Sequence, residues 1–184
     1  MTHELTVISS LNGKIGLPQA LQVLRDGGSA VDAVETGIRI VESNADDHSV
    51  GLGGYPNILG DVELDAGLME GEYLTSGAVA AVKTHQHPIS IARKVMENLP
   101  HVFLVGQGAE RFAREMGFED QDLLTQEAVT TWQQGLLTCM PKPFAKDIHA
   151  TPELWRWVEM TTDPQLTHGT TNFIALDSHG TLAA

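Results

Sequence analysis

Apolar residues recur at helical spacing in the first part of the chain. Val34, Ile38 and Val41 fall on one face of a helix. Ser29 stands before this run, and Asp32 follows at the spacing of a capping box, in which two side chains satisfy free backbone N–H groups of the first turn. The pattern therefore predicts an amphipathic helix that begins after Ser29 and buries one face.

A second pattern, the alternation of apolar and polar residues, begins at Val62. Val62, Leu64 and Ala66 alternate with Glu63 and Asp65, as the residues of a half-buried strand do. Similar patterns predict strands over Leu5–Ile8, Leu74–Val82, Val102–Val105 and Phe173–Leu176, helices from Pro18 to Gly27, from Pro88 to Asn98 and over Gly108–Met116, and a helical stretch with a long connection between Asp120 and Thr167. Because helices and strands are interspersed, the predicted class is α/β or α+β.

Length, charge and cysteine content narrow the class of protein. A chain of 184 residues suits one domain with a sizeable core. Its formal net charge of −13 argues against a nucleic-acid partner and against an anionic membrane surface, since both are bound through clustered Lys and Arg. The single cysteine, Cys139, fits a reducing compartment, and the N-terminus lacks the features of a signal peptide. We therefore expect a cytoplasmic protein, and a periplasmic location stays open.

The most informative stretch lies near the end of the chain, where Gly169-Thr170 precedes the apolar run Phe173–Leu176. One interpretation is that Gly-Thr simply opens a strand. The other is chemical. If the bond between Gly169 and Thr170 were cut, Thr170 would carry a free α-amine, whose pKa of about 8 would let it act as the base for the threonine's own hydroxyl.

Other residues could carry chemistry, but each has a simpler structural explanation. The run Gly51-Leu52-Gly53-Gly54 lacks the Lys of a phosphate loop and precedes a strand, so we interpret it as a tight approach of backbone to backbone. The eight histidines are scattered without a carboxylate at metal-site spacing, so we expect no metal site. We interpret Asp46-Asp47-His48 as a solvated loop, and Asp61, Glu63 and Asp65 as one polar face of a strand.

A set of motifs, taken together and in order, resembles one known family. The motifs are Asp32-Ala33-Val34-Glu35-Thr36-Gly37, Ser49-Val50-Gly51-Leu52-Gly53-Gly54-Tyr55-Pro56-Asn57, Val62-Glu63-Leu64-Asp65-Ala66, Gly77-Ala78-Val79-Ala80, His87-Pro88-Ile89-Ser90-Ile91-Ala92-Arg93, Pro100-His101-Val102-Phe103-Leu104-Val105-Gly106-Gln107-Gly108-Ala109 and His168-Gly169-Thr170. Their order and spacing resemble the glycosylasparaginase, plant-type asparaginase and isoaspartyl-peptidase family of N-terminal-nucleophile hydrolases. The resemblance covers nearly the whole chain.

The resemblance implies an α+β fold, a four-layer αββα sandwich, which we expect to be incomplete in this chain. It also implies a precursor that cuts itself before a threonine. Residues 1–169 would be the α-subunit portion and residues 170–184 the start of the β-subunit, within one domain truncated at its C-terminal end. The implied assembly is an α/β heterodimer that dimerises to a heterotetramer, with no cofactor.

The resemblance also assigns site residues. Thr170 matches the catalytic nucleophile, and His168 and Gly169 match the residues before the cut. The pair Leu11-Asn12 matches a pair at the substrate pocket in which the glycan-processing branch tends to carry Trp, so one aromatic wall of the pocket is expected to be absent. The implied activity is hydrolysis of the side-chain amide of asparagine or of N4-glycosylated asparagine.

Two other functions stay open. One is an isoaspartyl (β-aspartyl) peptidase of the same family. The other is a non-catalytic fragment that binds a partner through an open sheet edge, because the strand Phe173–Leu176 is expected to lack a neighbour. The family's substrate-binding and oxyanion residues would lie beyond Ala184, so we expect an incomplete active site in this chain.

Overall fold

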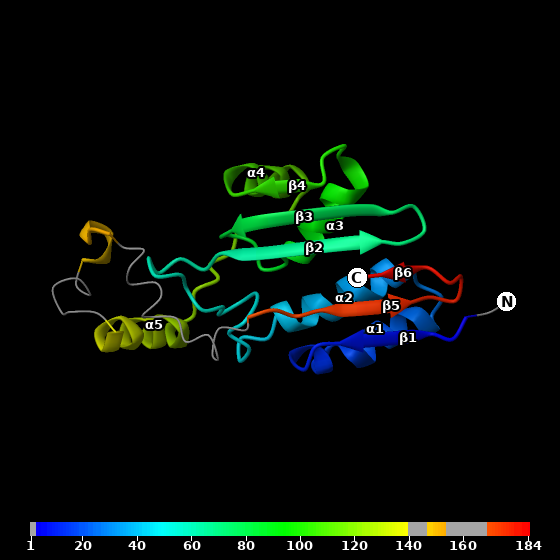
Figure 1. Cartoon of the computed structure of the whole chain (residues 1–184), viewed down its shortest axis with the longest axis horizontal. Helices are drawn as coiled ribbons and strands as arrows, with labels where there is room; N and C mark the ends of the chain where they lie inside the picture. Colours follow the sequence, from blue (N-terminus) through cyan, green and yellow to red (C-terminus); the bar gives the residue numbers. More distant parts are fainter. Residues whose placement is uncertain (1–2, 140–146, 154–168) are drawn as a thin grey trace.

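The computed structural model describes residues 3–139, 147–153 and 169–184 (Figure 1). The strands are β1 (Thr6–Ser9), β2 (Leu64–Glu70), β3 (Thr75–Val82), β4 (Phe103–Val105), β5 (Phe173–Leu176) and β6 (Leu182–Ala183). The helices are α1 (Leu17–Arg25), α2 (Ala30–Glu42), α3 (Pro88–Asn98), α4 (Gln107–Glu115) and α5 (Gln126–Cys139), with short 3-10 turns η1 (Asn12–Ile15) and η2 (Ile148–Ala150). The fold is a mixture of helices and strands, as the sequence predicts.

The strands of the described residues form one six-stranded sheet in the order β1-β5-β6-β2-β3-β4. Neighbouring strands are antiparallel except for β3 and β4, which run parallel. Strand β6 is only two residues long, and its Ala183 pairs with Ala175 of β5 and with Glu70 of β2. Because β6 is so short, it joins β5 to β2 only at the end of β5 that lies away from Thr170.

Strand β5 has a neighbouring strand on each side, contrary to the expectation from the sequence that it would lack one. It lies between β1 and β6, with Ile8 opposite Ile174 and Leu182 opposite Leu176. Phe173 is only 2% exposed, and its ring lies so close to Gly37 of α2 that a Cβ on this glycine would overlap it. The expectation was wrong because β5 pairs with the other end of the chain and with a strand of two residues.

Helix α2 is the central helix behind β5, and its local sequence signals are confirmed. The capping box is present, with the Ser29 side chain accepting from the Asp32 N–H and the Asp32 carboxylate accepting from the Ser29 N–H. Val34, Ile38 and Val41 are all buried, and they pack in one core cluster with Phe173. The start of β5 is therefore fixed by a well-packed helix.

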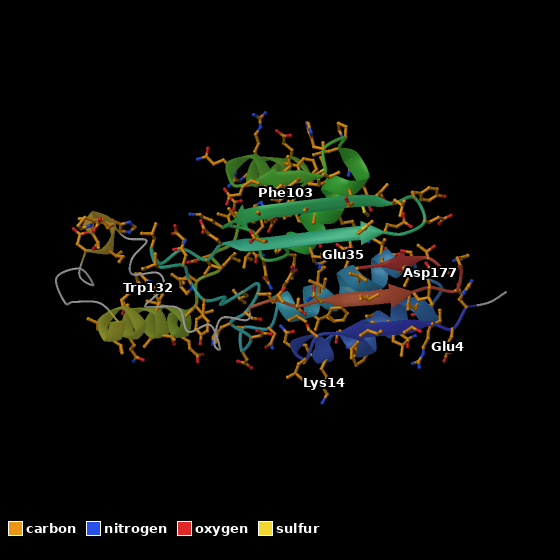
Figure 2. The ribbon with its side chains drawn as sticks, in the orientation of Figure 1. Glu4, Lys14, Glu35, Phe103, Trp132 and Asp177 are labelled. Carbon is orange, nitrogen blue, oxygen red and sulfur yellow. The ribbon has the colours of Figure 1, made fainter. Side chains whose placement is uncertain are left out.

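Among the described residues, helices α1 to α4 pack on one face of the sheet (Figure 1). Most side chains of the opposite face are exposed, and several of these are large and apolar, Phe103 on β4 among them (Figure 2). The set comprises Ile8, Met69, Phe103, Val105, Ile174 and Leu182. The sheet and helices α1 to α4 thus form two layers, and α5 lies beyond the end of the sheet (Figure 1).

Asp177, directly after β5, ties the end of this strand to the start of α2 (Figure 2). Its buried carboxylate accepts hydrogen bonds from the N–H groups of Ala30 at 3.1 Å, His179 at 3.0 Å and Thr181 at 3.0 Å. Burial opposes ionisation of Asp177, but these hydrogen bonds outweigh it and hold the pKa below its usual 3.8.

We expect Asp177→Asn to lower the free energy of unfolding by about 1–3 kcal/mol near neutral pH, because the amide group cannot accept all three hydrogen bonds. Since the folded-state pKa is depressed, the carboxylate stabilises the fold above its unfolded pKa of about 3.9, and this contribution is lost as the pH falls through the folded value. Urea denaturation should show wild type and variant converging on acidification. Ser178→Ala, at an exposed neighbour, is the control; a stability difference that persists in acid would contradict the assignment.

Candidate active site

Thr170 lies just before β5, on the wall of a cavity of about 570 Å³. The segment 169–172 forms one wall of this cavity, and residues 64–67 of β2 with residues 78–80 of β3 form another. The loop 49–51 also lines it. The cavity is thus on the side of the sheet where β6 does not reach, between the start of β5 and the β2–β3 hairpin.

Asn12 holds the backbone of Thr170 in place. Strand register sets Ser9 opposite Phe173, which brings the residues after β1 beside those before β5. The Asn12 side-chain amide donates to the Thr170 carbonyl oxygen at 3.1 Å and to Ser49 Oγ at 3.1 Å. The structure therefore brings the predicted supporting residue Asn12 into direct contact with the predicted nucleophile.

The residues after Thr170 are held by Ser10. The Ser10 N–H donates to the Asn172 carbonyl oxygen at 3.0 Å, and the Asn172 N–H donates to Ser10 Oγ at 3.1 Å. Thr171 Oγ1 lies 3.4 Å from the same hydroxyl. The backbone from Thr170 to Asn172 is thus attached at several points, while Thr170 itself is exposed.

The other predicted site residues lie in different surroundings. Gly169 is exposed, and a Cβ there would lie 3.0 Å from the Ser49 carbonyl oxygen, so glycine leaves this approach uncrowded. Leu11 is 91% exposed and does not line the cavity. His168 lies outside the described residues.

Glu42 is a residue of the cavity wall that the sequence patterns did not reveal. Its carboxylate is 2% exposed, lies 3.1 Å from His87 Nδ1 and accepts from the Ile89 N–H at 3.2 Å. Burial raises the pKa of this carboxyl, and the hydrogen bond to His87 opposes that rise. The available signal was its position one helical turn after Ile38, on the apolar face of the predicted helix.

The run Asp46-Asp47-His48 is only in part the solvated loop expected from the sequence. Asp46 is exposed, but the Asp47 carboxylate accepts from both the N–H and the hydroxyl of Ser49. His48 Nδ1 lies 2.7 Å from the Gly53 carbonyl oxygen. This loop is therefore folded against the residues that surround Thr170.

The glycine-rich loop after it is a tight approach of backbone to backbone, as predicted. Gly51 has a φ of 65°, and a Cβ there would overlap the carbonyl oxygen of Glu42. Gly53 has a φ of 75°, whereas the nearest atom to a Cβ on Gly54 is 3.3 Å away. The strictest demand for glycine falls on Gly51, beside the cavity.

Within residues 3–139, 147–153 and 169–184, no group of three or more His, Cys, Asp or Glu side chains could hold a metal ion. No helix in those ranges is long and apolar enough to cross a bilayer. The cavity wall carries the exposed Thr170, the buried Glu42, and the carboxyl residues Glu63 and Asp65.

Comparison with known proteins decides the family. The family model described as Asparaginase matches residues 9–184. The chain belongs to the asparaginase family. The resemblance drawn from the ordered motifs is thereby confirmed.

Individual relatives of the asparaginase family cover most of this chain. It is 40% identical over 183 residues to an N(4)-(β-N-acetylglucosaminyl)-L-asparaginase of Elizabethkingia miricola, an alignment that spans 99% of this chain and 48% of that protein. It is 36% identical over 165 residues to an isoaspartyl peptidase/L-asparaginase of Mus musculus, an alignment that spans 90% of this chain and 46% of that protein. It is 47% identical over 107 residues to a plant-type L-asparaginase of Pyrococcus horikoshii, an alignment that spans 58% of this chain and 35% of that protein. The chain thus spans less than half the length of each of these relatives.

Proposed function

We propose that this asparaginase-family chain belongs to a self-processing amidohydrolase in which Thr170 becomes the N-terminal nucleophile. The observation that carries the proposal is the placement of Thr170, which lies on the cavity wall with its carbonyl held by Asn12. Gly169, on the other side of the proposed cut, is exposed, and its lack of a Cβ avoids a 3.0 Å approach to the Ser49 carbonyl oxygen. A fixed nucleophile beside an accessible peptide bond is what self-cleavage requires.

In the proposed cut, Thr170 Oγ attacks the carbonyl carbon of Gly169. The bond from that carbon to the Thr170 nitrogen breaks, the nitrogen takes the hydroxyl proton, and an ester joins Gly169 to Thr170 Oγ. Water then hydrolyses the ester, which leaves a carboxylate on Gly169 and a free α-amine on Thr170. The contacts from Asn12 lie on the C-terminal side of Thr170, so the cut leaves them in place.

The same hydroxyl then acts on the substrate. Thr170 Oγ attacks the carbonyl carbon of an asparagine side-chain amide, and the Thr170 α-amine takes the hydroxyl proton and passes it to the leaving nitrogen. The product is a β-aspartyl ester on Thr170, and water releases aspartate from it. A cavity of about 570 Å³ lies within the range of small-molecule sites.

We propose the side-chain amide of asparagine, free or N4-glycosylated, as the substrate class. The alignment that spans 99% of this chain is with a protein named for the glycosylated amide. The alternative, an isoaspartyl peptidase, takes its support from the relative of Mus musculus that carries this name. The exposed Leu11 adds no wall to the cavity, so it favours neither substrate.

Release of aspartate from a panel of compounds tests this choice. Protein from the full reading frame is assayed on asparagine, on N4-(β-N-acetylglucosaminyl)-asparagine and on a β-aspartyl dipeptide. We expect the larger kcat/KM for one of the two asparagine amides. A larger kcat/KM for the β-aspartyl dipeptide would replace the proposal with the isoaspartyl peptidase.

The exposed apolar sheet face supports the proposed four-layer sandwich. Apolar side chains such as Ile174 and Phe103 are about half exposed there, and contiguous apolar surface of this kind marks a packing surface. We propose that a second sheet packs on this face and that the cut subunits stay together as an α/β heterodimer, which dimerises. A non-catalytic fragment would bind its partner through an unpaired β5, but β5 is paired on both sides.

A further inference from the structure

The residues around Thr170 form a continuous run of hydrogen bonds. Which group donates and which accepts in each bond is fixed, because the group at one end can only donate and the group at the other end can only accept. At one end is the backbone N–H of Asn172, which can only donate, so Ser10 Oγ must accept from it. The Ser10 hydroxyl then gives its hydrogen to Asn12 Oδ1 at 2.6 Å. This bond orients the Asn12 amide, because its oxygen faces Ser10 and its NH2 group faces the opposite way.

At the other end is the Asp47 carboxylate. In its ionised form this group accepts hydrogen bonds and cannot donate them. It takes the hydroxyl hydrogen of Ser49, and Ser49 Oγ therefore presents a lone pair to the Asn12 NH2 group. One hydrogen of that group goes to Ser49, and the other goes to the Thr170 carbonyl oxygen. Every donor in the run thus has one acceptor. We call the set the relay; its members are Asn172, Ser10, Asn12, Ser49 and Asp47.

The relay joins three segments that are far apart in the chain. Asn12 and Ser49 are 37 positions apart, and Asn12 and Thr170 are 158 positions apart. Ser49 and Asp47 are half-buried, so water competes only in part for these hydrogen bonds. The contact with Thr170 is on the side away from the proposed cut. The relay can therefore hold the nucleophile both before and after cleavage.

We propose that Asp47 is a positioning residue for the Thr170 nucleophile, acting through Ser49 and Asn12. Asp47 touches neither Thr170 nor the proposed scissile bond. It fixes the Ser49 hydroxyl as an acceptor, and thereby aims the Asn12 amide at the Thr170 carbonyl. The inference rests on the proposed role of Thr170. It adds a carboxylate, four positions before Gly51, that accepts from the N–H and hydroxyl of Ser49 and so reaches the site through that residue.

The first test compares three variants of the protein from its full reading frame. Asp47→Ala should lower kcat for amide hydrolysis about tenfold, the value of one hydrogen bond of ordinary strength, with KM within about twofold of wild type. Asp47→Asn should regain most of the loss, because its amide oxygen can accept both hydrogen bonds from Ser49. Asp46→Ala, at the exposed neighbour, should match wild type.

The second test asks whether Asp47 acts through Ser49. In a Ser49→Ala background, Asp47→Ala should change kcat by less than about twofold, because the hydroxyl through which Asp47 orients Asn12 is absent and only the hydrogen bond from the backbone N–H of residue 49 remains. Equal losses in both backgrounds would overturn the relay, as would an Asp47→Asn variant no better than Asp47→Ala or an Asp47→Ala variant with wild-type kcat. A wild-type protein that neither cuts nor hydrolyses amides would instead refute the proposed function, and the inference would fall with it.

Discussion

Thr170→Ala is expected to leave the chain uncut and to lower amide hydrolysis by roughly 10³- to 10⁶-fold. The variant lacks the hydroxyl that attacks the Gly169 carbonyl carbon, and without the cut no α-amine is released to act as base. Its backbone contacts, including the hydrogen bond from Asn12 to the Thr170 carbonyl, are unchanged. Denaturing gel electrophoresis and an aspartate-release assay measure both effects.

Thr171→Ala is the matched control for this prediction. Thr171 is the next residue and also carries a hydroxyl, but that hydroxyl lies 3.4 Å from Ser10 Oγ. The Thr171→Ala variant should cut and hydrolyse amides close to the wild-type rate. Cleavage between Gly169 and residue 170 in Thr170→Ala, or its loss in Thr171→Ala alone, would assign the nucleophile to a different residue.

Gly51→Ala is expected to lower the free energy of unfolding by about 2–5 kcal/mol and to slow self-cleavage. An L-residue at a φ of 65° costs about 1–2 kcal/mol, and the overlap of its Cβ with the Glu42 carbonyl oxygen adds a packing cost of about 1–3 kcal/mol. Relief of that overlap shifts the loop that carries Ser49, and Ser49 contacts Asn12. Urea denaturation and the rate of fragment formation measure the two effects.

Gly54→Ala controls for a methyl group added to the same loop. Gly54 is not among the glycines with a positive φ, and the nearest atom to its added Cβ is the Gly51 carbonyl oxygen at 3.3 Å. We expect a loss of less than about 1 kcal/mol in the Gly54→Ala variant. Equal losses in the two variants would show that the loop does not depend on the backbone conformation of Gly51.

The local elements of this fold could be predicted from sequence because their signals lie close together in the chain. The cap of α2 needs only Ser29 and Asp32, and its buried face follows from the spacing of Val34, Ile38 and Val41. The neighbours of β5 could not be predicted in this way. Its pairing with β1 joins opposite ends of the chain, and β6, with two residues, is too short to show alternation.

The residues of the candidate site also include some that could be predicted from the sequence and one that could not. Gly169 and Thr170 stand out in the sequence as a Gly-Thr junction before an apolar run, and the family resemblance favours the chemical interpretation of that junction. Asn12 follows from the resemblance alone. The role of Asp47 could not be predicted, because a carboxylate beside Asp46 and His48 has the composition of an ordinary surface loop. Only the folded structure shows that its acceptor oxygen meets Ser49 and, through Asn12, reaches a residue near the other end of the chain.

The central claim is that Thr170 becomes an N-terminal nucleophile, and the mass of the wild-type protein tests it most directly. Protein expressed from the full reading frame is analysed by intact mass spectrometry, and the N-terminal residue of each fragment is determined. We predict two fragments, the first ending at Gly169 and the second beginning with Thr170. A single uncut chain with full amide-hydrolysing activity, or a second fragment that begins at any other residue, would contradict the account.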